Sequence, residues 1–244
     1  MAVFHINKKT QAWYGESIGI LILDAAYPCI PGNVGNASTF DFPVRYEKVT
    51  GASIDRLLNQ QDPDLAEPFI QAAARLQQSG VRAVTGACGF MSLFQQQVAD
   101  TIDIPVFLSS LLQIPFIHQI TQKKIGIITA NASCLTSEHF TAAGVPQTLP
   151  MAIAGMENQV EFRDAVLREK GTLDSEKIQE EVVNVATALI QNHPDIGSIL
   201  LECSDLPPYA HAVQKAVNLP VFDFFTMINY VHTALVRSPF SGFM

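Results

Sequence analysis

The sequence has no hydrophobic run long enough to cross a membrane. Its most apolar early run, residues 18–23, ends at Asp24, far short of the roughly 20 apolar residues that a membrane helix requires. The first residues also have no apolar core of secretory length and no small-residue cleavage site. We therefore expect a cytoplasmic protein with no membrane partner.

Charge is scarce, and positive charge most of all. Charged residues make up 16% of the 244 residues, and the formal net charge is −8. A nucleic-acid-binding protein needs a basic face, so we expect no nucleic-acid partner. The 48% hydrophobic content is enough for a large buried core, and together with the low charge it favours a compact enzyme or a stable oligomer.

Cofactor and metal motifs are missing as well. The four cysteines show neither a CxxC motif nor zinc-site spacing, and the six histidines show no HExxH pattern. The glycines form no phosphate loop or dinucleotide fingerprint. We expect no cofactor, no metal and four free thiols, of which Cys29 and Cys134 serve packing.

Short apolar runs alternate with amphipathic segments along the chain. This alternation predicts two α/β domains, each with a parallel sheet covered by helices on both faces. The predicted strands are 17–23, 43–49, 81–85, 105–107, 123–131, 149–154, 196–201 and 220–222. The predicted helices are 64–79, one between Cys88 and Pro105, a short one capped by Thr136 or Ser137, 158–169, 174–192 and one between Cys203 and Pro220.

An internal repeat relates the two halves. Residues 81–117 align with residues 196–232 at a constant offset of 115, without a gap. Cys88 then falls on Cys203, and Pro105-Val106-Phe107 falls on Pro220-Val221-Phe222. Any two α/β units can share core residues by coincidence, but packing does not explain a cysteine at the same strand-to-helix junction in both copies.

The junction between the strand end and the following helix is a favourable place for a catalytic site. Ligands of open parallel sheets bind beyond the carboxyl ends of the strands, where a helix start holds carboxylates and lowers the pKa of a thiol. Two thiols on opposite faces of one carbon can act as base and acid and so invert a stereocentre. The repeat therefore predicts a cofactor-independent racemase with Cys88 and Cys203 as catalytic residues, at the interface of the domains.

These residues resemble the aspartate/glutamate racemase superfamily, which includes glutamate, hydantoin and broad-specificity amino-acid racemases. The resemblance covers nearly the whole chain and rests on the segments 31–33, 86–90, 129–131 and 201–205. It implies two pseudo-symmetric domains, residues 1–115 plus 224–244 and residues 116–223, and an amino-acid substrate. Its implied substrate-binding residues are Asn33, Gly89, Phe90, Thr129, Asn131 and Ser204.

Several assignments stay open at this point. Arg45 is the candidate cation for a side-chain carboxylate of the substrate, with Arg163 as a second. Asp205 could orient Cys203 or cap a helix, and capping is favoured because an adjacent carboxylate would raise the thiol pKa. The sequence departs from glutamate racemases at 24–26, 89–90 and 204–205, so the substrate is open, with aspartate or glutamate as the first expectation. The alternatives are a hydantoin racemase, a maleate-type cis–trans isomerase and a non-catalytic binding protein. A decarboxylase is disfavoured, because related decarboxylases keep only one of the two cysteines.

Overall fold

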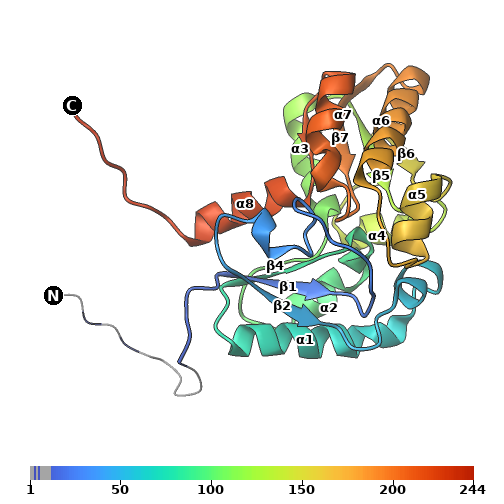
Figure 1. Ribbon diagram of the computed structural model, residues 1–244. Helices are drawn as coiled ribbons and strands as arrows, with labels where there is room; N and C mark the ends of the chain where they lie inside the picture. The colour runs from blue at the N-terminus through green and yellow to red at the C-terminus, as the bar shows by residue number, and fades with distance from the viewer. Residues whose placement is uncertain (1–2, 4, 6–11) are drawn as a thin grey trace.

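Two four-stranded parallel sheets form the framework of the protein (Figure 1). The computed structural model describes Val3, His5 and residues 12–244. The first sheet has the order β2-β1-β3-β4 and the second the order β6-β5-β7-β8, so adding four to each label converts one order into the other. The predicted pair of pseudo-symmetric α/β domains is confirmed. The strands are β1 (Ile18–Ile22), β2 (Val44–Lys48), β3 (Ala83–Gly86), β4 (Val106–Phe107), β5 (Lys124–Thr129), β6 (Met151–Gly155), β7 (Ile196–Leu201) and β8 (Val221–Phe222).

The repeat extends to individual main-chain hydrogen bonds. The N–H of Val84 donates to the carbonyl of Pro105 at 2.9 Å, and the N–H of Ile199 donates to that of Pro220 at 2.9 Å. Both members of the second pair lie 115 positions after those of the first. The constant offset in the sequence is therefore an offset between equivalent places in two sheets.

Helices cover the sheets and end where the sequence predicts. The helix α1 ends at Gln78, and Gly80 follows it with a φ of +92°, a backbone conformation that glycine adopts without steric strain. Asp174 caps α6 by accepting from the N–H of Lys177 at 3.2 Å. The helices are α1 (Ala66–Gln78), α2 (Gln95–Ala99), α3 (Ile114–Thr121), α4 (Ser137–Ala142), α5 (Val160–Phe162), α6 (Ser175–Asn192), α7 (Ala210–Val217) and α8 (Phe224–Leu235).

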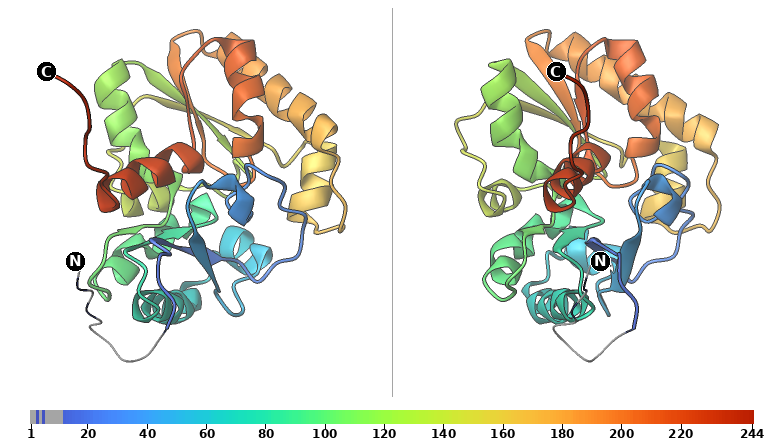
Figure 2. Two further views of the ribbon diagram at one scale, coloured as in Figure 1. Left: turned by 60° about the vertical axis from the view of Figure 1, so that its left-hand side comes forward. Right: turned by 90° about the vertical axis from the view of Figure 1, so that its left-hand side faces the viewer.

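The first sheet is covered on both faces because successive side chains of a strand point to opposite sides. Leu21 belongs to the same buried cluster as the apolar face of α1, whereas Ile18 and Ile20 pack with Phe224 and Ile228 of α8. Figures 1 and 2 show that α8, which follows the last strand of the second sheet, lies against the first half of the protein. The domain boundaries at 115/116 and 223/224 stay predictions.

One predicted helix is wrong in kind. The segment 158–169 forms a three-residue α5 followed by a π-helical turn, η6 (Arg163–Leu167). The N–H of Arg168 bonds to the carbonyl of Arg163, five residues back, so the turn is wider than an α-helical one. In addition, the structure has helices α3 and α8 where no helix was predicted. Within the described residues, no helix combines the length and apolar character of a membrane span.

Candidate functional site

Cys88 and Cys203 line one cavity between the two halves. Each cysteine follows its strand, β3 or β7, by two residues, and both are buried, with 9% and 4% exposure. All four cysteines, which lie in the described part of the chain, are free thiols. The cavity is lined by Leu23, Tyr27, Ile54, Leu58, Ala87, Cys88, Ala130, Val166, Leu167, Cys203, Ser204 and Asp205.

This cavity has a volume of about 20 Å³. A space of roughly 10–15 Å³ on this measure accommodates one water molecule, so a substrate of amino-acid size does not fit in the present conformation. A molecule of amino-acid size could reach the thiols only if the segments around the cavity moved apart.

The residue before each cysteine anchors it to the neighbouring strand in the same way. The N–H of Ala87 donates to Leu21 at 2.9 Å, and the N–H of Glu202 donates to Ile128 at 2.8 Å. The two halves also contact each other here, because the hydroxyl of Ser204 donates to the carbonyl of Ala87 at 2.6 Å. Ser204 therefore ties one half-site to the other and lines the cavity between them.

The pKa values of the two thiols differ from the expectation. Burial is the largest cause that raises the pKa of Cys88 well above its usual range, followed by the charge of Glu202; the N–H groups of Phe90 and Met91 oppose this. Burial, then the charge of Asp205, raises the pKa of Cys203 in the same way. The prediction of lowered thiol pKa values is wrong for this conformation, because desolvation outweighs the main-chain amides.

Asp205 is a buried acceptor and does not cap a helix. Its Oδ1 accepts from the side-chain amide of Asn33 at 2.6 Å, and its Oδ2 accepts from Cys203 Sγ at 3.4 Å and from the Tyr27 hydroxyl at 3.5 Å. Burial is the first cause that raises the pKa of this carboxyl. The helix-cap assignment was wrong, and the side chain of Asn33 bonds to Asp205 and to the N–H of Gly35.

Glu202 is a second buried carboxyl that the sequence did not single out. Its Oε2 accepts from the hydroxyl of Thr129 at 2.8 Å, and burial raises the pKa of Glu202 to about 7. The hydroxyl hydrogen of Thr129 is therefore used in the hydrogen bond to Glu202. Asn131 closes a local turn by accepting from the N–H of Ser133 at 3.1 Å. Neither Thr129 nor Asn131 is among the residues that line the cavity.

Gly89 and Phe90 follow Cys88 in the chain and are not among the residues that line the cavity. A side chain at Gly89 would collide with the carboxyl group of Glu202, so the chain can approach that carboxyl only with glycine here. Phe90 is fully buried, and its ring meets the ring of His139 edge-on, with centroids 5.0 Å apart. Burial lowers the pKa of His139 to about 4.

The two candidate cations lie elsewhere. Arg45 pairs with Glu16 at 2.9 Å, and its guanidinium lies 5.4 Å from the ring centroid of Trp13. In the sheet register Arg45 is opposite Gly19, near the amino end of β2, whereas the thiols follow the carboxyl ends of their strands. Arg163 pairs with Asp164 at 3.0 Å. No Lys or Arg is among the residues that line the cavity.

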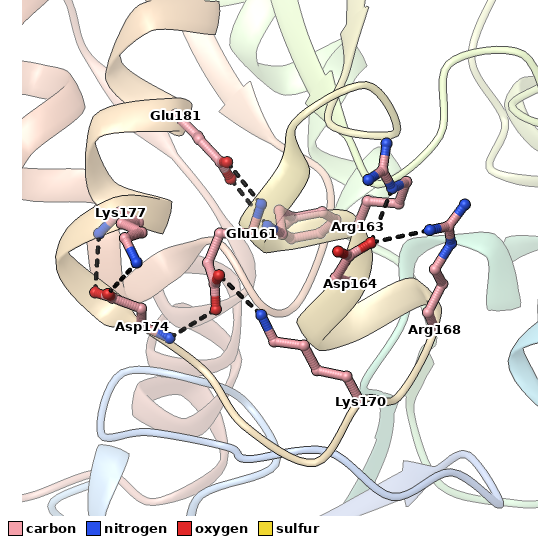
Figure 3. A network of polar contacts seen from close by, with 9 residues as sticks. Glu161, Arg163, Asp164, Arg168, Lys170, Asp174, Lys177 and Glu181 are labelled. Carbon is pink, nitrogen blue, oxygen red and sulfur yellow. Dashed lines mark hydrogen bonds and ion pairs between the residues drawn. The ribbon is translucent and has the colours of Figure 1, made fainter.

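A polar network holds the wall that the second half contributes (Figure 3). The carboxylate of Glu181 accepts from two main-chain N–H groups at the start of α5, at 2.7 and 2.9 Å. These two hydrogen bonds anchor the start of the segment whose residues Val166 and Leu167 line the cavity. Glu169, at the end of the segment, accepts from the N–H of Ala26 in the facing loop. Further ion pairs of the network join Glu161 to Lys170, Asp164 to Arg163 and Arg168, and Asp174 to Lys177.

The other two cysteines lie outside this cavity. Cys29 lines a neighbouring cavity of about 80 Å³ that shares Leu23, Tyr27 and Ala87 with the first. Burial raises the pKa of Cys29 to about 11. Cys134 Sγ lies 3.5 Å from the side-chain oxygen of Asn59. Among the described residues, no group of three or more His, Cys, Asp or Glu is placed to hold a metal ion.

Comparison with known proteins gives a family and a set of named relatives. Residues 53–228 match the family described as Asp/Glu/Hydantoin racemase. The chain is 33% identical to a dimethylsulfoniopropionate lyase of Durusdinium sp. clade D over 233 residues, covering 93% of this chain and 77% of that protein. It is 32% identical to dimethylsulfoniopropionate lyase 3 of Emiliania huxleyi (strain CCMP1516), covering 93% of this chain but only 61% of the relative, less than two thirds of its length.

Solved structures share the fold at low identity. Allantoin racemase from Pseudomonas fluorescens superposes with a TM-score of 0.64 at 16% identity, over 90% of this chain and 91% of that one. Arylmalonate decarboxylase superposes with a TM-score of 0.58 at 13% identity, over 92% and 94% of the two chains. Picrophilus torridus aspartate racemase gives 0.55 at 12% identity, over 89% and 93%. These likenesses are of fold.

Proposed function

The chain belongs to the Asp/Glu/hydantoin racemase family, and we propose that it is a lyase that cleaves dimethylsulfoniopropionate after Cys203 removes a proton from the carbon next to the carboxylate. The proposal joins a chemical step that suits a buried thiol pair to the substrate that the relatives' names give. The proposed substrate is therefore a carboxylate that carries a sulfonium group, in place of the amino acid expected from the sequence.

One observation carries the choice of substrate. The residues around the thiols include Tyr27 and Asp205 and no Lys or Arg. An aromatic ring and a carboxylate favour a cation such as sulfonium, whereas the second carboxylate of aspartate or glutamate calls for a cationic partner. The proposed position of the sulfonium is beside Tyr27 and Asp205, and that of the carboxylate is beside the main-chain N–H groups around Gly89 and Ser204.

The reaction balances without a further reactant. The Cys203 thiol gives its proton to Asp205, to which it already donates a hydrogen bond. The thiolate then takes the proton from the carbon next to the carboxylate. The electron pair of that C–H bond forms a double bond to the adjacent carbon, and the C–S bond breaks with its electrons on sulfur. The products are acrylate, neutral dimethyl sulfide, which leaves without needing an acid, and one proton, which Asp205 releases to solvent to restore the starting state.

The direct test is to incubate the purified protein with dimethylsulfoniopropionate and to measure dimethyl sulfide by gas chromatography and acrylate by chromatography. We expect both products in equal amounts, and we expect Cys203→Ser to lose them. Cys134→Ser is the matched control, because Cys134 lies outside the cavity, and it should retain the activity. Absence of both products from the folded wild-type protein would remove this proposal.

A second candidate is a cofactor-independent racemase of an amino acid or hydantoin. It is favoured by the two thiols at equivalent positions of the repeat, lining one cavity, as acid and base on opposite faces of a carbon require. Incubation in D₂O with L-Asp, L-Glu or a hydantoin distinguishes it: a racemase places deuterium on the α-carbon while optical rotation falls. Fumarate formed from maleate would instead indicate a cis–trans isomerase, and binding without turnover a non-catalytic protein.

Self-association stays a prediction that rests on the low charge content and the family resemblance. Light scattering tests it, because a monomer has a mass of 26.7 kDa and a homodimer has twice that.

A further inference from the structure

The two half-sites contact each other through positions that the repeat relates to one another. The hydroxyl of Ser204 in the second half bonds to the carbonyl of Ala87 in the first. Moving each position by the repeat offset of 115 turns Ala87 into Glu202 and Ser204 into Gly89. The contact between Ser204 and Ala87 therefore has a counterpart between Gly89 and Glu202.

The counterpart is built differently. Gly89 has no hydroxyl to donate, and the carbonyl of Glu202 accepts instead from the hydroxyl of Ser110 at 3.0 Å. The space that a side chain at position 89 would fill is taken by the Glu202 carboxyl group itself. Where the first half-site carries the methyl group of Ala87, the second thus carries a carboxyl group that reaches across to the residue after Cys88.

This carboxyl group is fully buried and only half satisfied. Its Oε2 accepts from Thr129, whereas its Oε1 has no hydrogen-bond partner in the part of the chain that the structure describes. A buried carboxylate with one neutral donor is costly, and protonation removes most of that cost. In accord with this, burial raises the pKa of Glu202 to about 7.

The charge of Glu202 raises the pKa of both thiols, but it ranks differently among the causes for each. It is the largest cause after burial that raises the pKa of Cys88, whereas for Cys203 the charge of Asp205 comes before it. The other titratable groups near the site are Tyr27, which lines the same cavity, and His139, which packs on Phe90. Both carboxyl groups act on both thiols, but Asp205 ranks first among the charges for Cys203, which also donates a hydrogen bond to it, and Glu202 ranks first among the charges for Cys88.

We propose that Glu202 is a positioning residue that makes the two thiols unequal: it seats the turn carrying Cys88 by contact with Gly89, and when ionised it keeps Cys88 in the neutral thiol form. Cys203 is then the thiol that forms a thiolate. The inference rests on the proposed function only in taking these two thiols as the reacting pair.

The test measures thiol ionisation without substrate, so its result does not depend on whether the protein cleaves dimethylsulfoniopropionate. The rate of iodoacetamide alkylation is followed against pH for each cysteine by peptide mass spectrometry. In Glu202→Gln the midpoint for Cys88 should move to lower pH by about one unit, which gives on the order of a tenfold faster rate near pH 8. Cys203 should shift less, and Cys29 and Cys134 serve as internal references.

Glu157→Gln is the matched control, because Glu157 accepts from the N–H of Ala132 and is not among the residues that line the cavity. It should leave the midpoint for Cys88 unchanged. A folded Glu202→Gln protein with an unshifted Cys88 midpoint would overturn the proposal, as would an equal shift of both thiols.

A second measurement keeps the proposal testable if Glu202→Gln does not fold. Thr129→Val removes the hydrogen bond that lowers the pKa of Glu202, so the carboxyl should ionise at higher pH than in the wild type. Difference infrared spectra follow the carbonyl stretch of the buried protonated carboxyl against pH. Because a neutral Glu202 does not oppose the thiolate, the alkylation midpoint of Cys88 should move to lower pH as the carboxyl titration moves to higher pH. A Cys88 midpoint that stays in place while the carboxyl titration moves would contradict the coupling.

Discussion

Cys203 and Asp205 form a buried pair in which the thiol donates to Oδ2 of the carboxyl at 3.4 Å. The two residues are separated by Ser204 alone, so the turn after β7 brings donor and acceptor together. The same carboxyl is held by Asn33 and Tyr27 from the first half. The thiol of Cys203 is therefore oriented by a carboxyl group that two residues of the other half hold in place.

This arrangement predicts opposite effects of Asp205→Asn on ionisation and on turnover. The charge of Asp205 raises the pKa of Cys203, so its removal should shift the alkylation midpoint of Cys203 to lower pH. The group that accepts the thiol proton is lost at the same time, so kcat for dimethyl sulfide release should fall by about 100-fold. Asp195→Asn, at an exposed ion pair with Lys124, is the control and should change neither. A variant with full kcat would exclude Asp205 as the proton acceptor.

A methyl group at position 89 should destabilise the protein. In Gly89→Ala the added carbon meets the carboxyl group of Glu202 and lies 2.8 Å from its carbonyl oxygen, so side chain or backbone must shift. We expect the free energy of unfolding in urea to fall by about 1–3 kcal/mol, which is typical of overpacking. Gly242→Ala, where an added Cβ meets nothing within 4 Å, should be neutral.

Adding Glu202→Ala to Gly89→Ala removes the colliding carboxyl and should restore part of the lost stability. A double variant that is destabilised by the sum of the two single effects would show that the two residues do not interact.

The repeat made the two matching α/β halves and the equivalent positions of the thiols predictable from sequence, whereas the strand order within each sheet was not predicted. The alignment that pairs Cys88 with Cys203 also pairs main-chain hydrogen bonds at Val84 and Ile199. Strand ends could be located because apolar runs stop at small or polar residues. The fold followed from local patterns that both halves share.

The partners of the thiols could not be predicted in this way. Tyr27 meets Asp205 across 178 positions and Thr129 meets Glu202 across 73, and such contacts depend on how the halves pack. Arg45 was chosen for its charge, but strand register places it beside Gly19, away from the carboxyl ends. One signal for Glu202 was present in the sequence: the repeat aligns this carboxyl residue with Ala87, so the two half-sites differ in chemistry at this position.

Stability should depend on pH through Glu202. Burial raises its pKa from 4.5 to about 7, so between these values the folded protein binds more protons than the unfolded chain. The stability that the neutral carboxyl permits is present below pH 4.5 and is lost as the pH rises to about 7, by on the order of 3 kcal/mol.

His139 acts in the opposite direction. Burial lowers its pKa from 6.5 to about 4, so the unfolded chain binds more protons in that interval and stability rises with pH. The two effects overlap, and the wild-type profile alone does not separate them. Urea unfolding of the wild type and Glu202→Gln at pH 4.5 and 7 does: we expect the wild type to lose stability relative to the variant. Parallel profiles would mean that Glu202 stays ionised when buried.

Access to the thiols should depend on the contact between Glu169 and the N–H of Ala26. This contact joins the loop after β1 to the segment carrying Val166 and Leu167, which closes the cavity from the other half. Removing one such hydrogen bond costs about 1 kcal/mol, which corresponds to about a fivefold larger open population. Glu169→Ala should therefore speed alkylation of Cys88 and Cys203 about fivefold and equally, with unchanged pH midpoints. Glu180→Ala, on the exposed face of α6, should leave the rates unchanged. Faster alkylation of one thiol alone, or a shifted midpoint, would mean that Glu169 acts on thiol ionisation and not on access.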